Sequence, residues 1–88
     1  MPRPYLEITY RQGKPFAAYL YLERRPGDKV SRTQRHGEWM VDLADDGRAL
    51  GIEFIHVGKV DLAALNAMLQ QIRQPILSME DIVPLNAA

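Results

Sequence analysis

Cysteine is absent from the 88 residues of the chain. Disulfide bonds, cysteine nucleophiles and thiolate metal sites are therefore excluded. The sequence also lacks an apolar run of the roughly 18 residues that a membrane span needs. Its first residues lack the apolar segment of a secretory signal. These absences predict a cytoplasmic protein that does not associate with a membrane.

Charge of one sign is not in excess, because eleven Lys and Arg residues balance eleven Asp and Glu residues. The two parts of the chain nevertheless differ in sign. Residues 1–36 carry eight basic and three acidic side chains, and residues 37–88 carry three basic and eight acidic ones. This division is typical of a basic surface that binds nucleic acid, or of two halves or two subunits that attract each other.

The length of the chain predicts a single domain over residues 1–88 with a small hydrophobic core. Five segments favour strands by their alternation or their composition: residues 5–10, 16–23, 29–35, 39–44 and 48–57. Both faces of 16–23 are apolar or aromatic, which indicates a central strand or a strand that is covered on its second face. The polar segment 29–35 indicates an exposed edge strand. Because short turns join these segments, we predict an antiparallel β-meander over residues 5–57.

Two glycines mark special backbone positions in this predicted sheet. Asp46-Gly47 is a hairpin signal, because such turns require positive φ angles. Gly51 lies inside the last strand and indicates a bulge or a close approach by another backbone.

The C-terminal part changes from strand to helical spacing. Asp61 is a suitable N-cap, apolar residues then recur at helical spacing, and Pro75 ends the pattern, so we predict a helix over residues 61–74. Residues 75–88 form an apolar tail in which Ser78 and Asp81 favour a single helical turn near 79–83. The predicted fold class is α+β, with one C-terminal helix packed on the sheet.

The segment from residue 39 to 55 resembles a known module. It carries Asp46, Gly47, Gly51, Ile52 and Glu53 in the order found in the small bacterial proteins of the domain of unknown function 2283 family. With segments 8–10 and 18–22, the resemblance covers residues 6–57. It implies a β-meander with a C-terminal helix and no established activity. At the first hairpin, where the family usually has acidic residues, this chain has Arg11, Lys14 and Phe16.

No set of residues in the sequence predicts a catalytic, cofactor or metal site. His36 and His56 are the only histidines, and joining His56 to Glu53 or Asp61 at a metal would need a spacing that is not typical of metal sites. Asp42, Asp45, Asp46 and Glu53 cluster near a hairpin, but turn formation explains the Asp-Asp-Gly run. A cross-strand arginine is the expected partner of Glu53: Arg32, Arg35 or Arg48.

We therefore expect a non-enzymatic interaction module that binds a protein partner or itself. The alternatives are a nucleic-acid-binding accessory protein, in which aromatic and basic side chains form a stacking surface, and, less favoured, a small enzyme with a carboxylate site. The aromatic strand face and the apolar tail together predict a homodimer. The predicted interaction surface comprises Tyr19, Tyr21, Arg32, Arg35, Ile76, Leu77, Met79, Ile82 and Val83.

Overall fold

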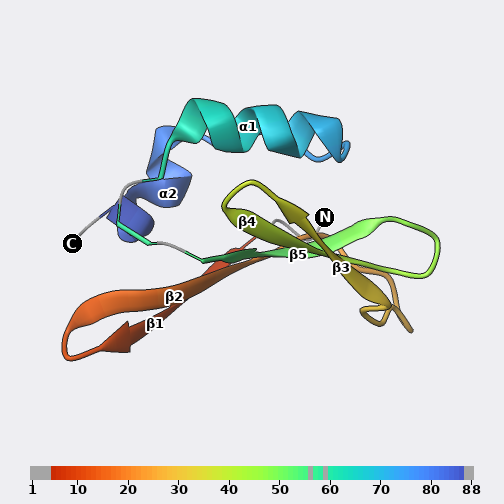
Figure 1. Cartoon of the computed structure of the whole chain (residues 1–88), viewed down its shortest axis with the longest axis horizontal. Helices are drawn as coiled ribbons and strands as arrows, with labels where there is room; N and C mark the ends of the chain where they lie inside the picture. The colour runs from red at the N-terminus through yellow and green to blue at the C-terminus, as the bar shows by residue number, and fades with distance from the viewer. Residues whose placement is uncertain (1–4, 56, 59, 87–88) are drawn as a thin grey trace.

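A five-stranded antiparallel sheet with both helices on the same face makes up the fold (Figure 1). The computed structural model describes residues 5–55, 57–58 and 60–86. The strands are β1 (Tyr5–Arg11), β2 (Lys14–Tyr21), β3 (Arg32–His36), β4 (Trp39–Leu43) and β5 (Ala49–Phe54), and the helices are α1 (Leu62–Gln71) and α2 (Met79–Asn86). The α+β class is confirmed. Neither helix has the length and apolar character needed to cross a membrane.

The order of the strands across the sheet is β1-β2-β5-β4-β3, which differs from the consecutive order of a simple meander. Strands β3, β4 and β5 form a meander, and β5 then pairs with β2, so that β2 to β5 make a Greek key. This strand order follows the polarity of the strands. The apolar β5 is almost entirely buried at a central position, whereas the polar β3 lies at the edge, as its sequence predicts.

The hairpin between β1 and β2 is tighter than the sequence indicates. Gln12 and Gly13 both have positive φ angles, 53° and 78°, which is the requirement of a two-residue type I′ turn. Pro15 therefore lies within β2, opposite Tyr10 and next to a bulge in the pairing. Such a place suits proline, because it has no N–H to donate to the ladder.

Helix α1 begins at the predicted N-cap, since the Asp61 carboxylate accepts a hydrogen bond from the Ala64 N–H. It ends at Gln71, three residues before the predicted end. Arg73 adopts a left-handed conformation with φ of 60°, and the N–H of Gln74 bonds back to the carbonyl of Leu69. The helix ends early because the left-handed Arg73 closes it in a Schellman motif, in which the N–H of Arg73 also bonds to the carbonyl of Gln70.

The tail contains a second helix where we predicted a single turn. Helix α2 starts after Ser78, whose backbone N–H donates to the Asp81 carboxylate at 2.8 Å, and it continues through Pro84 to Asn86. Its residues Ile82 and Leu85 are 1% and 0% exposed, and α2 contacts β1. The tail therefore packs on its own sheet, and the prediction of one C-terminal helix is corrected to two.

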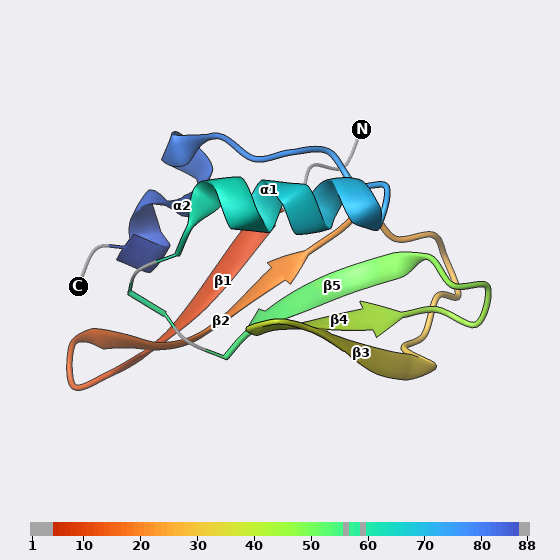
Figure 2. The same ribbon diagram turned by 45° about the horizontal axis from the view of Figure 1, so that its top comes forward.

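The core lies between the helices and the face of the sheet that they cover (Figure 2). Strands and both helices contribute its fully buried side chains: Val41, Leu50, Ile52, Phe54, Leu65, Leu69, Ile82 and Leu85. The opposite face of the sheet has no described helix or strand packed against it. The strand residues whose side chains point to this uncovered face are therefore not covered by a described helix or strand.

Candidate interaction surface

The uncovered face of the sheet carries three tyrosines in contact with one another. The rings of Tyr5 and Tyr21, which are cross-strand partners, stack with centroids 4.7 Å apart and planes inclined by 15°. Tyr19 meets Tyr21 edge to face at 4.8 Å. The guanidinium of Arg24 lies 5.6 Å from the centroid of the Tyr21 ring. We call Tyr5, Tyr19, Tyr21 and Arg24 the tyrosine cluster.

Hydrogen bonds link the tyrosine cluster to the far edge of the sheet. Arg24 donates to the Leu50 carbonyl at 3.2 Å and to the Tyr19 hydroxyl at 3.4 Å. The Tyr19 hydroxyl donates to Asp42 Oδ2 at 2.6 Å. Thr33 donates to the other oxygen of the same carboxylate, also at 2.6 Å. This hydrogen-bond network runs across the sheet from Tyr19 on β2 to Thr33 on β3 and orients these side chains.

The environment of this face raises the pKa of Tyr19 and of Tyr21. Burial raises the pKa of Tyr19 above its ordinary value, and the hydrogen bond to Asp42 and the negative charge of that carboxylate raise it further. The hydrogen bond to Glu7, 3.2 Å long, raises the pKa of Tyr21. Both phenols therefore stay neutral near pH 7. They offer hydrogen-bonding and stacking groups, but no base for proton transfer.

Acidic and basic side chains are mixed around the tyrosine cluster. Glu7 on β1, Asp42 on β4 and Glu53 on β5 share the uncovered face with Arg11, Arg24 and Arg35. The predicted arginine partner of Glu53 is wrong, because its cross-strand neighbours are Tyr19 and Met40 and its side chain is exposed. The surface is thus aromatic and mixed in charge.

The nine residues of the predicted interaction surface do not form one surface. Tyr19, Tyr21 and Arg35 lie on the uncovered face, whereas Arg32 alternates to the helix side of β3. The prediction that Ile82 lies on the interaction surface is corrected, because Ile82 is buried in the core of its own chain. Leu77 is partly buried beside that core. The others are exposed on or beside α2: Ile76 at 58%, Met79 at 59% and Val83 at 53%.

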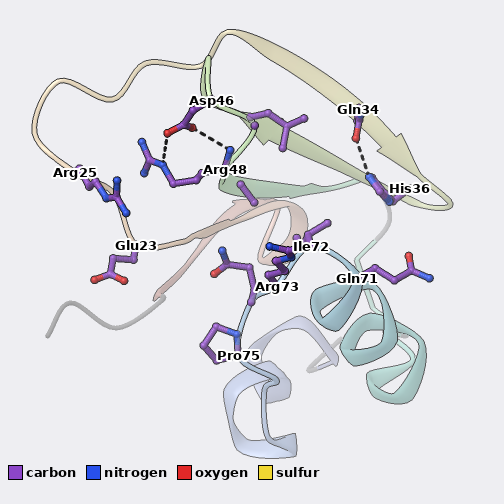
Figure 3. Close-up of a pocket in the computed structure, with 14 residues that line it drawn as sticks. Glu23, Arg25, Gln34, His36, Asp46, Arg48, Gln71, Ile72, Arg73 and Pro75 are labelled. Atoms are coloured by element: carbon purple, nitrogen blue, oxygen red, sulfur yellow. Dashed lines mark hydrogen bonds and ion pairs between the residues drawn. The ribbon is translucent and has the colours of Figure 1, made fainter.

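A second feature is a cleft of about 760 Å³ between the end of α1 and the β4–β5 hairpin (Figure 3). Arg25, Arg48 and Arg73 line it together with Glu23 and Asp46. His36, the one histidine within the described residues, also lies there and contacts Gln34 at 3.3 Å. The hypothesis that His56 binds a metal concerns a residue outside the described ones.

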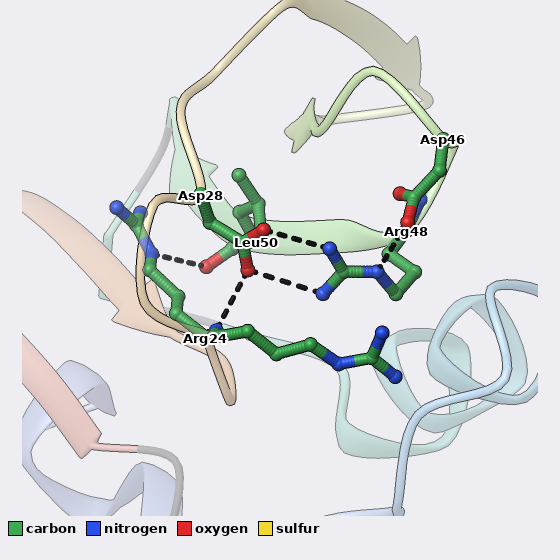
Figure 4. A network of polar contacts seen from close by, with 6 residues as sticks. Arg24, Asp28, Asp46, Arg48 and Leu50 are labelled. Carbon is green, nitrogen blue, oxygen red and sulfur yellow. Dashed lines mark hydrogen bonds and ion pairs between the residues drawn. The ribbon is translucent and has the colours of Figure 1, made fainter.

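Arg48 in this cleft is held by two carboxylates (Figure 4). Its guanidinium makes a two-bond contact with Asp28, at 2.7 and 3.1 Å, and its Nε donates to Asp46 at 2.7 Å. Hydrogen bonds from Arg48 and from the Arg25 N–H lower the pKa of Asp28 to about 2. Hydrogen bonds from Arg48 also lower the pKa of Asp46. Asp28, Asp46 and Arg48 therefore all stay charged near neutral pH. This suits a structural ion-pair network and not acid–base chemistry.

Sequence reasoning missed Arg24, Tyr5 and Asp28. The placement of Arg24 and Asp28 depends on the loop between β2 and β3, which has no periodic pattern. Tyr5 could have been found, because the alternation of β1 places it on the same face as Glu7 and Thr9.

Comparisons of the chain with protein-family models, curated proteins and solved structures give no significant match. The resemblance to the domain of unknown function 2283 family therefore stays a prediction.

Proposed function

We propose that this chain is a small non-enzymatic interaction module that binds a second copy of itself on the side of the molecule formed by β1 and α2. The contrast between the two edge strands supports this proposal. Strand β3 has five residues, RTQRH, with two arginines that discourage further pairing. Strand β1 has seven residues, YLEITYR, and contains neither proline nor lysine. An edge of this kind is a template for pairing with another chain.

Exposed aromatic and apolar side chains border this edge of the molecule on both faces of the sheet. Tyr5 on the uncovered face of β1 is 60% exposed, and Tyr10 on the helix side is 58% exposed. Helix α2 lies beside β1 and adds Met79 and Val83, both more than half exposed. A second copy would cover these groups, and aromatic and methionine side chains are enriched in the cores of protein interfaces.

The mass of the protein in solution tests the proposal. Light scattering coupled to size exclusion should give twice the chain mass of 10.0 kDa at micromolar concentration. Met79→Ser and Val83→Ser should weaken the dimer. Val30→Ser is the matched control, because Val30 is also an exposed apolar residue (47%) but lies in the loop between β2 and β3. A mass of one chain at every concentration would overturn the proposal.

The charges on the uncovered face do not form the continuous basic surface that favours nucleic acid over a protein partner. Glu7, Asp42 and Glu53 lie among Arg11, Arg24 and Arg35, so carboxylates interrupt the basic side chains that would neutralise a phosphate backbone. Fluorescence anisotropy with single-stranded oligonucleotides at low salt should show no binding. Binding that weakens steeply as salt is added would instead favour the nucleic-acid hypothesis.

A further inference from the structure

The outer edge of β1 is free to pair within the described part of the chain. Strand β1 is the first in the sheet order and pairs only with β2. None of the backbone hydrogen bonds found outside the described helices and strands involves residues 5–11. In an antiparallel strand, alternate residues direct their N–H and C=O groups to each side, so the outward groups of β1 can serve a second strand.

The charges of β1 select one register for pairing with an identical strand. Glu7 and Arg11 are the only charged residues on β1, and neither has an ion-pair partner among the described residues. Both alternate to the uncovered face, together with Thr9. A two-fold axis through Glu7 would oppose two carboxylates, and an axis through Arg11 would oppose two guanidinium groups. An axis through Thr9 opposes Glu7 to Arg11 of the second copy, twice.

We propose that two copies pair antiparallel through β1, with Thr9 on the two-fold axis and Glu7 of each copy opposite Arg11 of the other. This inference rests on the proposed self-association and specifies its geometry. Opposite charges directly across two strands stabilise the pairing, and like charges destabilise it. On the helix side of the sheet, the same register places Ile8 opposite Tyr10 of the second copy, an aromatic and β-branched pair that packs well.

The pairing also closes the assembly. An isologous contact uses the same strand of both copies, so β1 is consumed in the dimer. The two remaining edges of the joined sheet are the β3 strands, which are short and carry Arg32 and Arg35. These edges resist further addition. The expected product is therefore a dimer and not a fibre.

Charge reversal tests the register. Glu7→Arg and Arg11→Glu should each raise the dissociation constant by about tenfold or more, because each replaces two attractive pairs with two repulsive ones. An equimolar mixture of the two variants should recover the wild-type affinity as a heterodimer, since every opposed pair is again of unlike charge. Glu53→Arg is the matched control, because Glu53 is exposed on the same face but on the central strand β5.

A cysteine placed on the axis gives an independent readout that does not depend on charge. The chain has no native cysteine, so Thr9→Cys introduces a single thiol per copy. The two thiols would lie across one strand pair, within the reach of a disulfide. Thr9→Cys should cross-link rapidly under mild oxidation, whereas Thr33→Cys on β3 should not.

The outcomes separate the inference from the proposed function. A wild-type monomer overturns both. A dimer whose affinity is unchanged in the Glu7→Arg and Arg11→Glu variants, or a Thr33→Cys variant that cross-links as fast as Thr9→Cys, overturns the β1 register alone. Circular dichroism of each variant confirms that it is folded, and the cysteine variants give the answer if a charge reversal unfolds the chain.

Discussion

The phenol ring of Tyr19 occupies the space beside Gly51 that a side chain at that position would fill. Gly51 lies on β5 between β2 and β4, opposite Tyr21 on one side and Asp42 on the other. Because Gly51 has no Cβ, the Tyr19 side chain can pass over β5 and reach the Asp42 carboxylate on the next strand. The close approach at Gly51 is therefore made by a side chain and not, as the sequence predicts, by another backbone.

Gly51→Ala should destabilise the fold by about 1–3 kcal/mol, as expected when a methyl group is forced into an occupied site. Chemical denaturation of the two proteins measures the difference. In a Tyr19→Ala background the same substitution should cost much less, because the ring no longer competes for the space. An equal cost in both backgrounds would contradict this account.

Tyr19 should be the last tyrosine of the folded protein to lose its proton. Burial and the hydrogen bond to Asp42 raise its pKa above the value in the unfolded chain, which is about 10. The folded state then holds its proton more tightly, so stability is unaffected below pH 10 and falls as the pH rises above it. In an ultraviolet titration, the phenol that ionises last should be lost in Tyr19→Phe and should ionise earlier in Asp42→Asn.

Local sequence patterns predict the strands and helices, but they do not predict which distant residues come into contact. The alternation of residues 5–10 and the Asp61 cap both depend on neighbours along the chain, and the structure has each in place. The pairing of β2 with β5 joins residues thirty or more positions apart, as in Ala18 opposite Phe54. No short-range signal specifies such a pairing. Pro84 likewise obscured α2, because proline normally interrupts a helix.

The candidate surface was predictable only in part for the same reason. Alternation alone places Tyr19 and Tyr21 on one face of β2, where the structure has them. The composition of the tail predicts one apolar patch, because composition does not tell which side of α2 is buried. The structure divides it, with Ile82 in the core and Val83 exposed.

Asp28 should stabilise the folded protein at neutral pH through Arg48. Its pKa is about 2 in the folded state, below the ordinary value of 3.8, so its contribution is complete above pH 3.8 and is lost as the pH falls toward 2. Asp28→Asn should therefore lower the urea midpoint at pH 7. The difference from the wild type should shrink on acidification. Asp45→Asn, in the neighbouring turn, is the control and should leave the midpoint nearly unchanged.

Helix α2 should be an integral part of the fold and not a detachable arm. Ile82→Ala removes a side chain that is 1% exposed and should cost about 2–5 kcal/mol of the free energy of unfolding, because it leaves a cavity among the core residues. Val83→Ala changes the next residue of the same helix, which is 53% exposed, and should cost no more than about 0.5 kcal/mol. Denaturation at a concentration where the protein is monomeric separates these effects from dimer formation. Equal, small losses for both variants would mean that α2 contributes little to the core.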